Sequence, residues 1–116
     1  MALQIFYKIL PGAVWDAARL RGRFEGSGID LVDGYIHLSA AGQVVETAAR
    51  HFAGIEGLVI VAVPEEAVAK NLKWEASRGG ALFPHVYGVI DPAQVSWVKD
   101  LPWNGTAHDF PDGALR

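Results

Sequence analysis

The chain has 116 residues, of which 51% are hydrophobic, and a formal net charge of −3 at pH 7. This length fits one globular domain with a single core, and the negative charge gives no general attraction for nucleic acids or anionic membranes. Because the chain contains no cysteine, disulfides, thiolate metal sites and cysteine nucleophiles are excluded.

The first predicted elements are a strand, a helix and a loop. Residues 3–10 are apolar, aromatic and β-branched and end at a proline-glycine pair, which predicts a strand. Residues 13–20 carry apolar side chains at helical spacing and are followed by a glycine, which predicts a short helix. Two glycines within 24–32 indicate a loop that leads into a turn at Asp33.

The next predicted strand, residues 35–39, carries the histidine around which the rest of the chain is organised. Strand alternation places Tyr35, His37 and Ser39 on one polar face and two aliphatic residues on the other. A polar face of this kind can line a cleft while the opposite face closes a core. We expect Ser39 to cap a helix whose apolar stripe extends over residues 44–52.

Residues 58–77 are expected to form the central strand of the sheet, a helical turn and a further strand. Residues 58–63 are apolar at every position, as expected for a central strand covered on both faces. A helical turn is predicted over 64–68, where a proline is followed by two glutamates. Residues 72–77 alternate, with Glu75 on the side that we expect to face solvent.

The C-terminal part predicts two more strands and an irregular tail. The strands extend over 85–90 and 95–101, and residues 102–116 show no periodicity. The predicted fold class is therefore α+β, a single domain over 1–116. We expect a mixed or mostly antiparallel sheet of about six strands, with two helices on one side of it.

Two histidines are the leading candidates for a functional site, because each shares its strand face with a tyrosine. If their strands are neighbours, Tyr35, His37, His85 and Tyr87 lie on one polar surface. The alternative is that each histidine is a half-buried strand residue whose ring nitrogens are bonded locally. Catalytic roles for both histidines depend on that shared surface.

Glu75 and Arg78 are further candidates. A carboxylate near two imidazoles can orient a hydroxyl or stabilise a cationic transition state, whereas the alternative for Glu75 is a solvated charge. Arg78 precedes two glycines, a setting in which a guanidinium can bind a phosphate or carboxylate. Glu75 and the two histidines also have the ligand chemistry of a metal site. Their spacing does not require a metal, and we predict none.

Four segments of the chain together resemble a known bacterial family. They are IFYKI at 5–9, DGYIHLS at 33–39, KWE at 73–75 and FPHVYG at 83–88. In this order they resemble the family called domain of unknown function 952, over nearly the whole chain. The resemblance implies a remote similarity to the ADP-ribosyltransferase-like fold, which is shared by NAD-using transferases and RNA 2′-phosphotransferases. Such enzymes hold NAD in a cleft of a split antiparallel sheet.

The resemblance also implies roles for individual residues. His37 and Ser39 would bind the ribose on the nicotinamide side, and Tyr87 would stack on the base. Glu75 would be the acidic partner. In such folds the first strand often carries a histidine or arginine at the position of Tyr7 or Lys8, so Lys8 departs from the pattern.

Three functional hypotheses follow. The first is a transferase or hydrolase that acts on NAD or a related phosphoribosyl compound, with NAD as substrate and no certain cofactor. The second is a non-catalytic pocket for a small anionic metabolite, formed by His37, His85 and Arg78. The third is a protein-interaction module, since four tryptophans are many for this length. They are Trp15, Trp74, Trp97 and Trp103.

The expected location is the cytoplasm. No run without Asp, Glu, Lys or Arg exceeds 12 residues, which is too short to span a bilayer. The partner that we expect is a small molecule, not a nucleic acid or a membrane, and the sequence predicts no oligomeric state.

Overall fold

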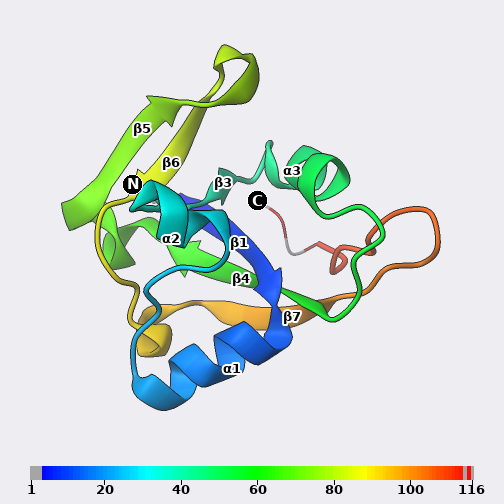
Figure 1. Cartoon of the computed structure of the whole chain (residues 1–116), viewed down its shortest axis with the longest axis horizontal. Helices are drawn as coiled ribbons and strands as arrows, with labels where there is room; N and C mark the ends of the chain where they lie inside the picture. Colours follow the sequence, from blue (N-terminus) through cyan, green and yellow to red (C-terminus); the bar gives the residue numbers. More distant parts are fainter. Residues whose placement is uncertain (1–3, 114, 116) are drawn as a thin grey trace.

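The chain folds into two antiparallel sheets that share a core (Figure 1). The computed structural model describes residues 4–113 and residue 115, apart from the side chain of Arg78. The strands are β1 (Ile5–Pro11), β2 (Ile36–His37), β3 (Ser39–Ala40), β4 (Leu58–Pro64), β5 (Leu72–Ala76), β6 (Leu82–Val86) and β7 (Trp97–Leu101). The α-helices are α1 (Gly12–Arg21), α2 (Ile29–Asp33) and α3 (Val44–His51). Short 3-10 turns occur at Glu65–Ala67, Ala69–Asn71, Arg78–Gly80 and Pro92–Gln94.

The first sheet has the strand order β3-β1-β4-β7 and the second β2-β6-β5. β4 pairs with β1 on one side and with β7 on the other, and most of its residues are buried. The prediction that residues 58–63 form a central strand is therefore confirmed. The α+β class is also confirmed, although the chain forms two antiparallel sheets instead of one.

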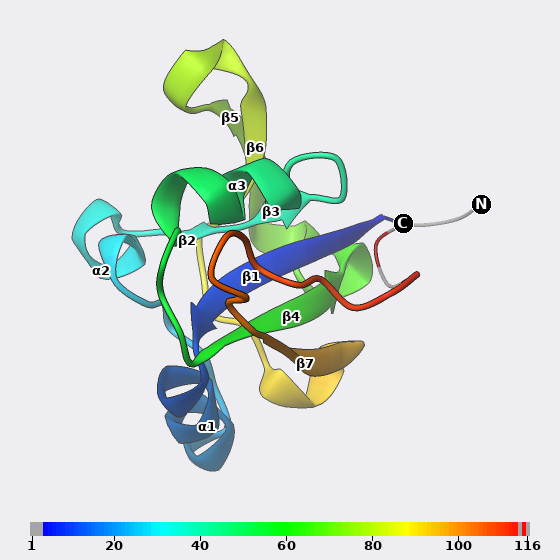
Figure 2. The same cartoon turned by 90° about the vertical axis from the view of Figure 1, so that its right-hand side faces the viewer.

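Helices cover both faces of the first sheet, and the expectation that they lie on one side is wrong. α1 packs through Trp15 and Ala18 against one face, and α3 packs through Val44 and Ala48 against the other. Figure 2 shows α1 and α3 on opposite sides of β1 and β4. The reason is that β1 and β4 carry large apolar side chains on both faces, so each face needs a cover.

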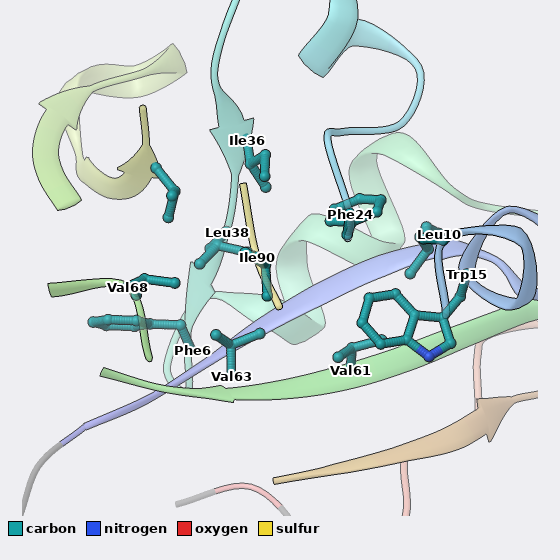
Figure 3. Packing of buried hydrophobic residues seen from close by; sticks show 12 residues of the cluster. Phe6, Leu10, Trp15, Phe24, Ile36, Leu38, Val61, Val63, Val68 and Ile90 are labelled. Atoms are coloured by element: carbon teal, nitrogen blue, oxygen red, sulfur yellow. The ribbon is translucent and has the colours of Figure 1, made fainter. Parts of the chain in front are cut away.

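The larger core cluster joins the two sheets (Figure 3). Phe6 and Val63 from the first sheet belong to it together with Ile36 from the second. Trp15 and Phe24 close one end, with ring centroids 5.6 Å apart. Because both sheets share this cluster, the opposite face of the second sheet is left for polar side chains.

The predicted strand over residues 35–39 is in fact divided between the two sheets. His37 ends β2 and pairs with β6, whereas Ser39 begins β3 and pairs with Tyr7 of β1. Between them, the Leu38 N–H donates to the carbonyl of Pro84 at 3.0 Å. Ile36 and Leu38 are both buried in the shared core, so the chain crosses from one sheet to the other at this point.

Two other predicted boundaries are wrong. The predicted loop over 24–32 contains α2, and the predicted strand over 85–90 is instead β6, which spans Leu82–Val86. β6 includes Pro84, which the sequence analysis treated as lying outside the strand. Proline is tolerated there because pairing with β5 and the carbonyl contact to Leu38 do not need its missing N–H.

The tail is irregular but packed. Within residues 102–113, Trp103 and His108 form an isolated bridge, and Phe110 packs against the core cluster next to α3. The tryptophans differ in burial: Trp15 is buried, Trp97 and Trp103 are half-buried, and Trp74 is 40% exposed. In the described part of the chain, none of the helices is long and apolar enough to cross a membrane.

Candidate functional site

Two histidines and two tyrosines lie together on the polar face of the second sheet. His37 of β2 is the direct partner of His85 of β6, and their ring centroids are 5.1 Å apart. The Tyr35 ring lies 4.6 Å from the His37 ring, 4.4 Å from the His85 ring and 5.0 Å from the Tyr87 ring. The prediction that these four side chains lie together on one face is confirmed, although His85 is buried beneath its neighbours, and we call the four residues the histidine-tyrosine cluster.

Glu75 connects β5 to this cluster. Its Oε1 accepts hydrogen bonds from His85 Nδ1 and from the Tyr87 hydroxyl, both at 2.8 Å. The bonds from His85 and Tyr87 hold the pKa of Glu75 below its ordinary value. The same bond to Glu75 raises the pKa of Tyr87 to about 12. Glu75 therefore belongs to the site and is not an isolated solvated charge.

Two aspartates of α2 hold the other histidine. His37 Nδ1 lies 2.7 Å from Asp30 Oδ1, and His37 Nε2 lies 3.1 Å from Asp33 Oδ2. The backbone N–H of His37 also donates to Asp30 Oδ1 at 3.1 Å. Since a carboxylate only accepts, both ring contacts are hydrogen bonds at the same time only when both ring nitrogens carry a proton.

Asp30 is anchored by a buried lysine. Lys8 Nζ lies 2.7 Å from Asp30 Oδ2 and donates to the carbonyl of His37 at 3.0 Å. The side chains of Lys8 and Asp30 are 9% and 0% exposed. Burial opposes ionisation of Asp30, but the hydrogen bond from His37 and the charge of Lys8 outweigh it and lower the pKa of Asp30. Burial also lowers the pKa of Lys8, against the opposing effect of Asp30.

Asp30 and Asp33 were not predicted as site residues, and Lys8 was not predicted to have a structural role. Asp30 lies within the segment 24–32, which its glycines marked as a loop, and Asp33 directly follows that segment. One signal was present: Asp30 is flanked by Ile29 on one side and by two aliphatic residues on the other. A single acid among aliphatic residues suits a buried, paired carboxylate.

Ser39 does not join the cluster. It is buried in β3 of the first sheet, where its Oγ lies 2.9 Å from Thr47 Oγ1. The prediction that Ser39 caps the following helix is also wrong, because α3 begins at Val44 and follows Gln43. The Gln43 side chain instead accepts from the Ala40 N–H at 2.9 Å.

Arg78 begins the turn that joins β5 to β6, and its side chain lies outside the described part of the structure. Lys73 is a cation that contacts the cluster. Its Nζ lies 5.0 Å from the centroid of the Tyr87 ring, within the range of a cation-π contact. No group of three or more His, Asp or Glu side chains placed to bind a metal occurs among the described residues.

Two cavities lie away from the cluster. One, of about 740 Å³, is lined by the start of α1, β4 and the end of β7; the other, of about 130 Å³, lies between α3 and the tail. In contrast, the His85 ring is buried under its neighbours, and its Nε2 has no hydrogen-bond partner among the described residues. The cluster is therefore a packed surface in this structure.

Gly34 sets the position of Tyr35, and this gives a prediction. Gly34 ends α2 with φ 86°, and a Cβ added there meets nothing within 4 Å. We expect Gly34→Ala to lower the free energy of unfolding by about 1–2 kcal/mol, which is the cost of the left-handed conformation. The matched control is Gly42→Ala, which also adds a Cβ in open space but without a positive φ. Urea unfolding of both variants measures the difference, and equal stabilities would contradict the prediction.

Comparison with known proteins identifies related chains. The model of the family described as "Protein of unknown function (DUF952)" matches residues 9–98. The crystal structure of protein CC0527 from Caulobacter crescentus is 50% identical in sequence, with a TM-score of 0.85, and the match covers 90% of this chain and 93% of that one. The solution NMR structure of CC0527 is 51% identical, with a TM-score of 0.79 and 90% of each chain covered. A search of curated proteins found no significant match.

Proposed function

The chain belongs to the DUF952 family, whose description names no activity, and from its own side chains we propose a transferase or hydrolase that acts on NAD or a related phosphoribosyl compound. One observation carries the proposal: the histidine-tyrosine cluster and Glu75 meet on one face, next to the point where the chain passes between the sheets. The similarity to the ADP-ribosyltransferase-like fold that the sequence implies supports the same substrate class.

His37 is the proposed ribose-binding residue. Its contact with Asp30 is short and buried, whereas Nε2 and Asp33 meet at a half-exposed edge, with side chains 27% and 35% exposed. A ribose diol offers two hydroxyls, which can donate to the Asp33 carboxylate and accept from His37 Nε2. The buried Asp30 fixes the ring so that this edge is presented to a ligand.

The tyrosines and Glu75 supply the rest of the proposed site. Tyr87 is 40% exposed and can stack on the nicotinamide ring. When the bond between ribose C1′ and the nicotinamide nitrogen breaks, positive charge grows on the ribose. The Glu75 carboxylate, whose pKa is lowered by His85 and Tyr87, is ionised at neutral pH and stabilises that charge.

Calorimetric titration of NAD tests this function. We expect wild-type protein to give a saturable heat, and we expect His37→Asn to weaken binding at least about tenfold, equivalent to about 1.4 kcal/mol. Glu46→Gln is the matched control, since Glu46 is on α3 and pairs with Arg50. The absence of heat with the wild-type protein would overturn the proposal.

A second candidate is a non-catalytic pocket for a small anionic metabolite. The observation that favours it is the cationic Lys73 beside Tyr87. In that case a nucleotide or sugar phosphate raises the melting temperature, and no product forms during long incubation. Product formation that disappears in His37→Ala would reject this candidate.

A further inference from the structure

One ring nitrogen of His85 has no hydrogen-bond partner among the described residues. Its Nδ1 lies 2.8 Å from Glu75 Oε1, and because a carboxylate only accepts, the Nδ1 carries the proton. In the neutral ring, Nε2 is then a lone-pair acceptor. Nε2 is buried and has no partner among the described residues.

A buried acceptor without a partner destabilises the fold, so its persistence calls for a physical reason. A hydroxyl brought by a ligand would satisfy it. Tyr35 is half-buried and its ring lies 4.4 Å from that of His85, so a ligand that displaces Tyr35 gains access to the His85 ring.

The second histidine has no such spare position. Both ring nitrogens of His37 face carboxylates, those of Asp30 and Asp33. The two imidazoles, although direct cross-strand partners, therefore have different surroundings. His37 is arranged to donate hydrogen bonds, whereas His85 is arranged to accept one at Nε2.

We propose that His85 and Glu75 form a catalytic dyad in which His85 Nε2 takes the proton from an attacking hydroxyl, and that Glu75, besides stabilising the charge on the ribose, orients the His85 ring through Nδ1. This inference rests on the proposed function and names the second reactant as water or an alcohol. The hydroxyl oxygen forms a bond to ribose C1′ while the bond from C1′ to the nicotinamide nitrogen breaks. The electron pair of that bond goes to the nitrogen, nicotinamide leaves as a neutral molecule, and the hydroxyl proton goes to His85 Nε2.

The tautomer of His85 tests the dyad without any ligand. Long-range ¹H–¹⁵N correlation spectra of ¹⁵N-labelled protein at neutral pH distinguish a proton on Nδ1 from one on Nε2. We expect the wild-type ring to be neutral and protonated at Nδ1, and we expect Glu75→Ala to lose this preference so that both tautomers are populated. Glu75→Gln keeps an amide oxygen that can accept from Nδ1 and should restore most of the preference. Glu46→Gln, the matched control, should leave it unchanged.

The outcomes separate the dyad from the proposed function. A proton on Nε2 of wild-type His85, or an unchanged tautomer in Glu75→Ala, overturns the dyad even when NAD binds. If His85 shows the expected tautomer but the protein gives no heat with NAD, the proposed function is overturned. The proposed transfer of the ribosyl group from nicotinamide to the hydroxyl is then overturned as well. If both hold, His85→Gln should reduce the rate of NAD consumption by about 10²–10⁴-fold. Its dissociation constant for NAD should stay near the wild-type value, and a rate equal to that of the wild type would overturn the dyad.

Discussion

Replacing Lys8 with methionine is expected to lower the free energy of unfolding by about 3–5 kcal/mol. The cause is the charge that remains: the Asp30 side chain is completely buried, and Lys8 Nζ lies 2.7 Å from its Oδ2. Removing the lysine leaves a buried carboxylate whose remaining partners are the His37 ring and the backbone N–H groups of Ser27 and His37. Methionine keeps most of the side-chain volume, so the loss reflects the charge and not a cavity.

A double-mutant cycle isolates this pair. We expect Lys8→Met with Asp30→Asn to lose less stability than the sum of the two single changes, because the double variant leaves no unpaired charge in the interior. Lys70→Met, at an exposed position, is the matched control and should change stability by no more than about 0.5 kcal/mol. Urea unfolding measures all four variants. A loss below about 1 kcal/mol in Lys8→Met would show that the pair does not hold α2 against β1.

Glu75→Gln is expected to lower the pKa of Tyr87 from about 12 towards the ordinary tyrosine value of about 10. The hydrogen bond from the Tyr87 hydroxyl to Glu75 Oε1 stabilises the neutral phenol, and the charge of Glu75 disfavours a phenolate beside it. Loss of the negative charge removes the repulsion and weakens the bond. An ultraviolet titration of phenolate absorbance, stopped at about pH 11, should show one more ionised tyrosine in the variant.

A second variant is needed to assign the additional tyrosine ionisation to Tyr87. Burial, followed by the charges of Asp33 and Glu75, also raises the pKa of Tyr35. Tyr87→Phe should therefore remove the extra transition from the Glu75→Gln background, and Glu46→Gln should titrate like the wild type. A wild-type protein whose Tyr87 is already ionised at about pH 11 would contradict the hydrogen bond to Glu75.

The parts of the fold that could be predicted from sequence depend on local patterns. The apolar run over 58–63 required burial on both faces, and β4 lies between two strands. In each of two segments a histidine and a tyrosine lie two residues apart. The prediction that these four side chains lie together depended only on β2 and β6 being neighbours. Strand alternation then placed Tyr35 and Tyr87 beside the two histidines.

The parts that could not be predicted depend on contacts between distant segments. α2 has five residues, too few for a helical pattern, and Asp30 within it is fixed by Lys8 from the first strand. The passage between sheets at Leu38 depends on which strands lie on either side of it, which alternation alone does not determine. Ser39 has the chemistry of a helix cap, but its place in the first sheet brings it to Thr47 instead.

Lys8, which departs from the pattern expected of an ADP-ribosyltransferase-like fold, has a structural role in this chain. In the proposed site it does not contact a ligand. Its ammonium group binds Asp30 and the carbonyl of His37, and Asp30 in turn binds the ring of His37. The first strand therefore contributes to the candidate site by holding His37 in place.

The most direct test of the proposed site is the amide ¹H–¹⁵N spectrum of the wild-type protein during titration with NAD. The account predicts saturable shifts at residues 33–37, 73–75 and 85–87, where the histidine-tyrosine cluster and Glu75 lie. Residues 45–53 and 103–110, around the small apolar cavity, should not shift. Shifts confined to that cavity, or no shifts at all, would contradict the account.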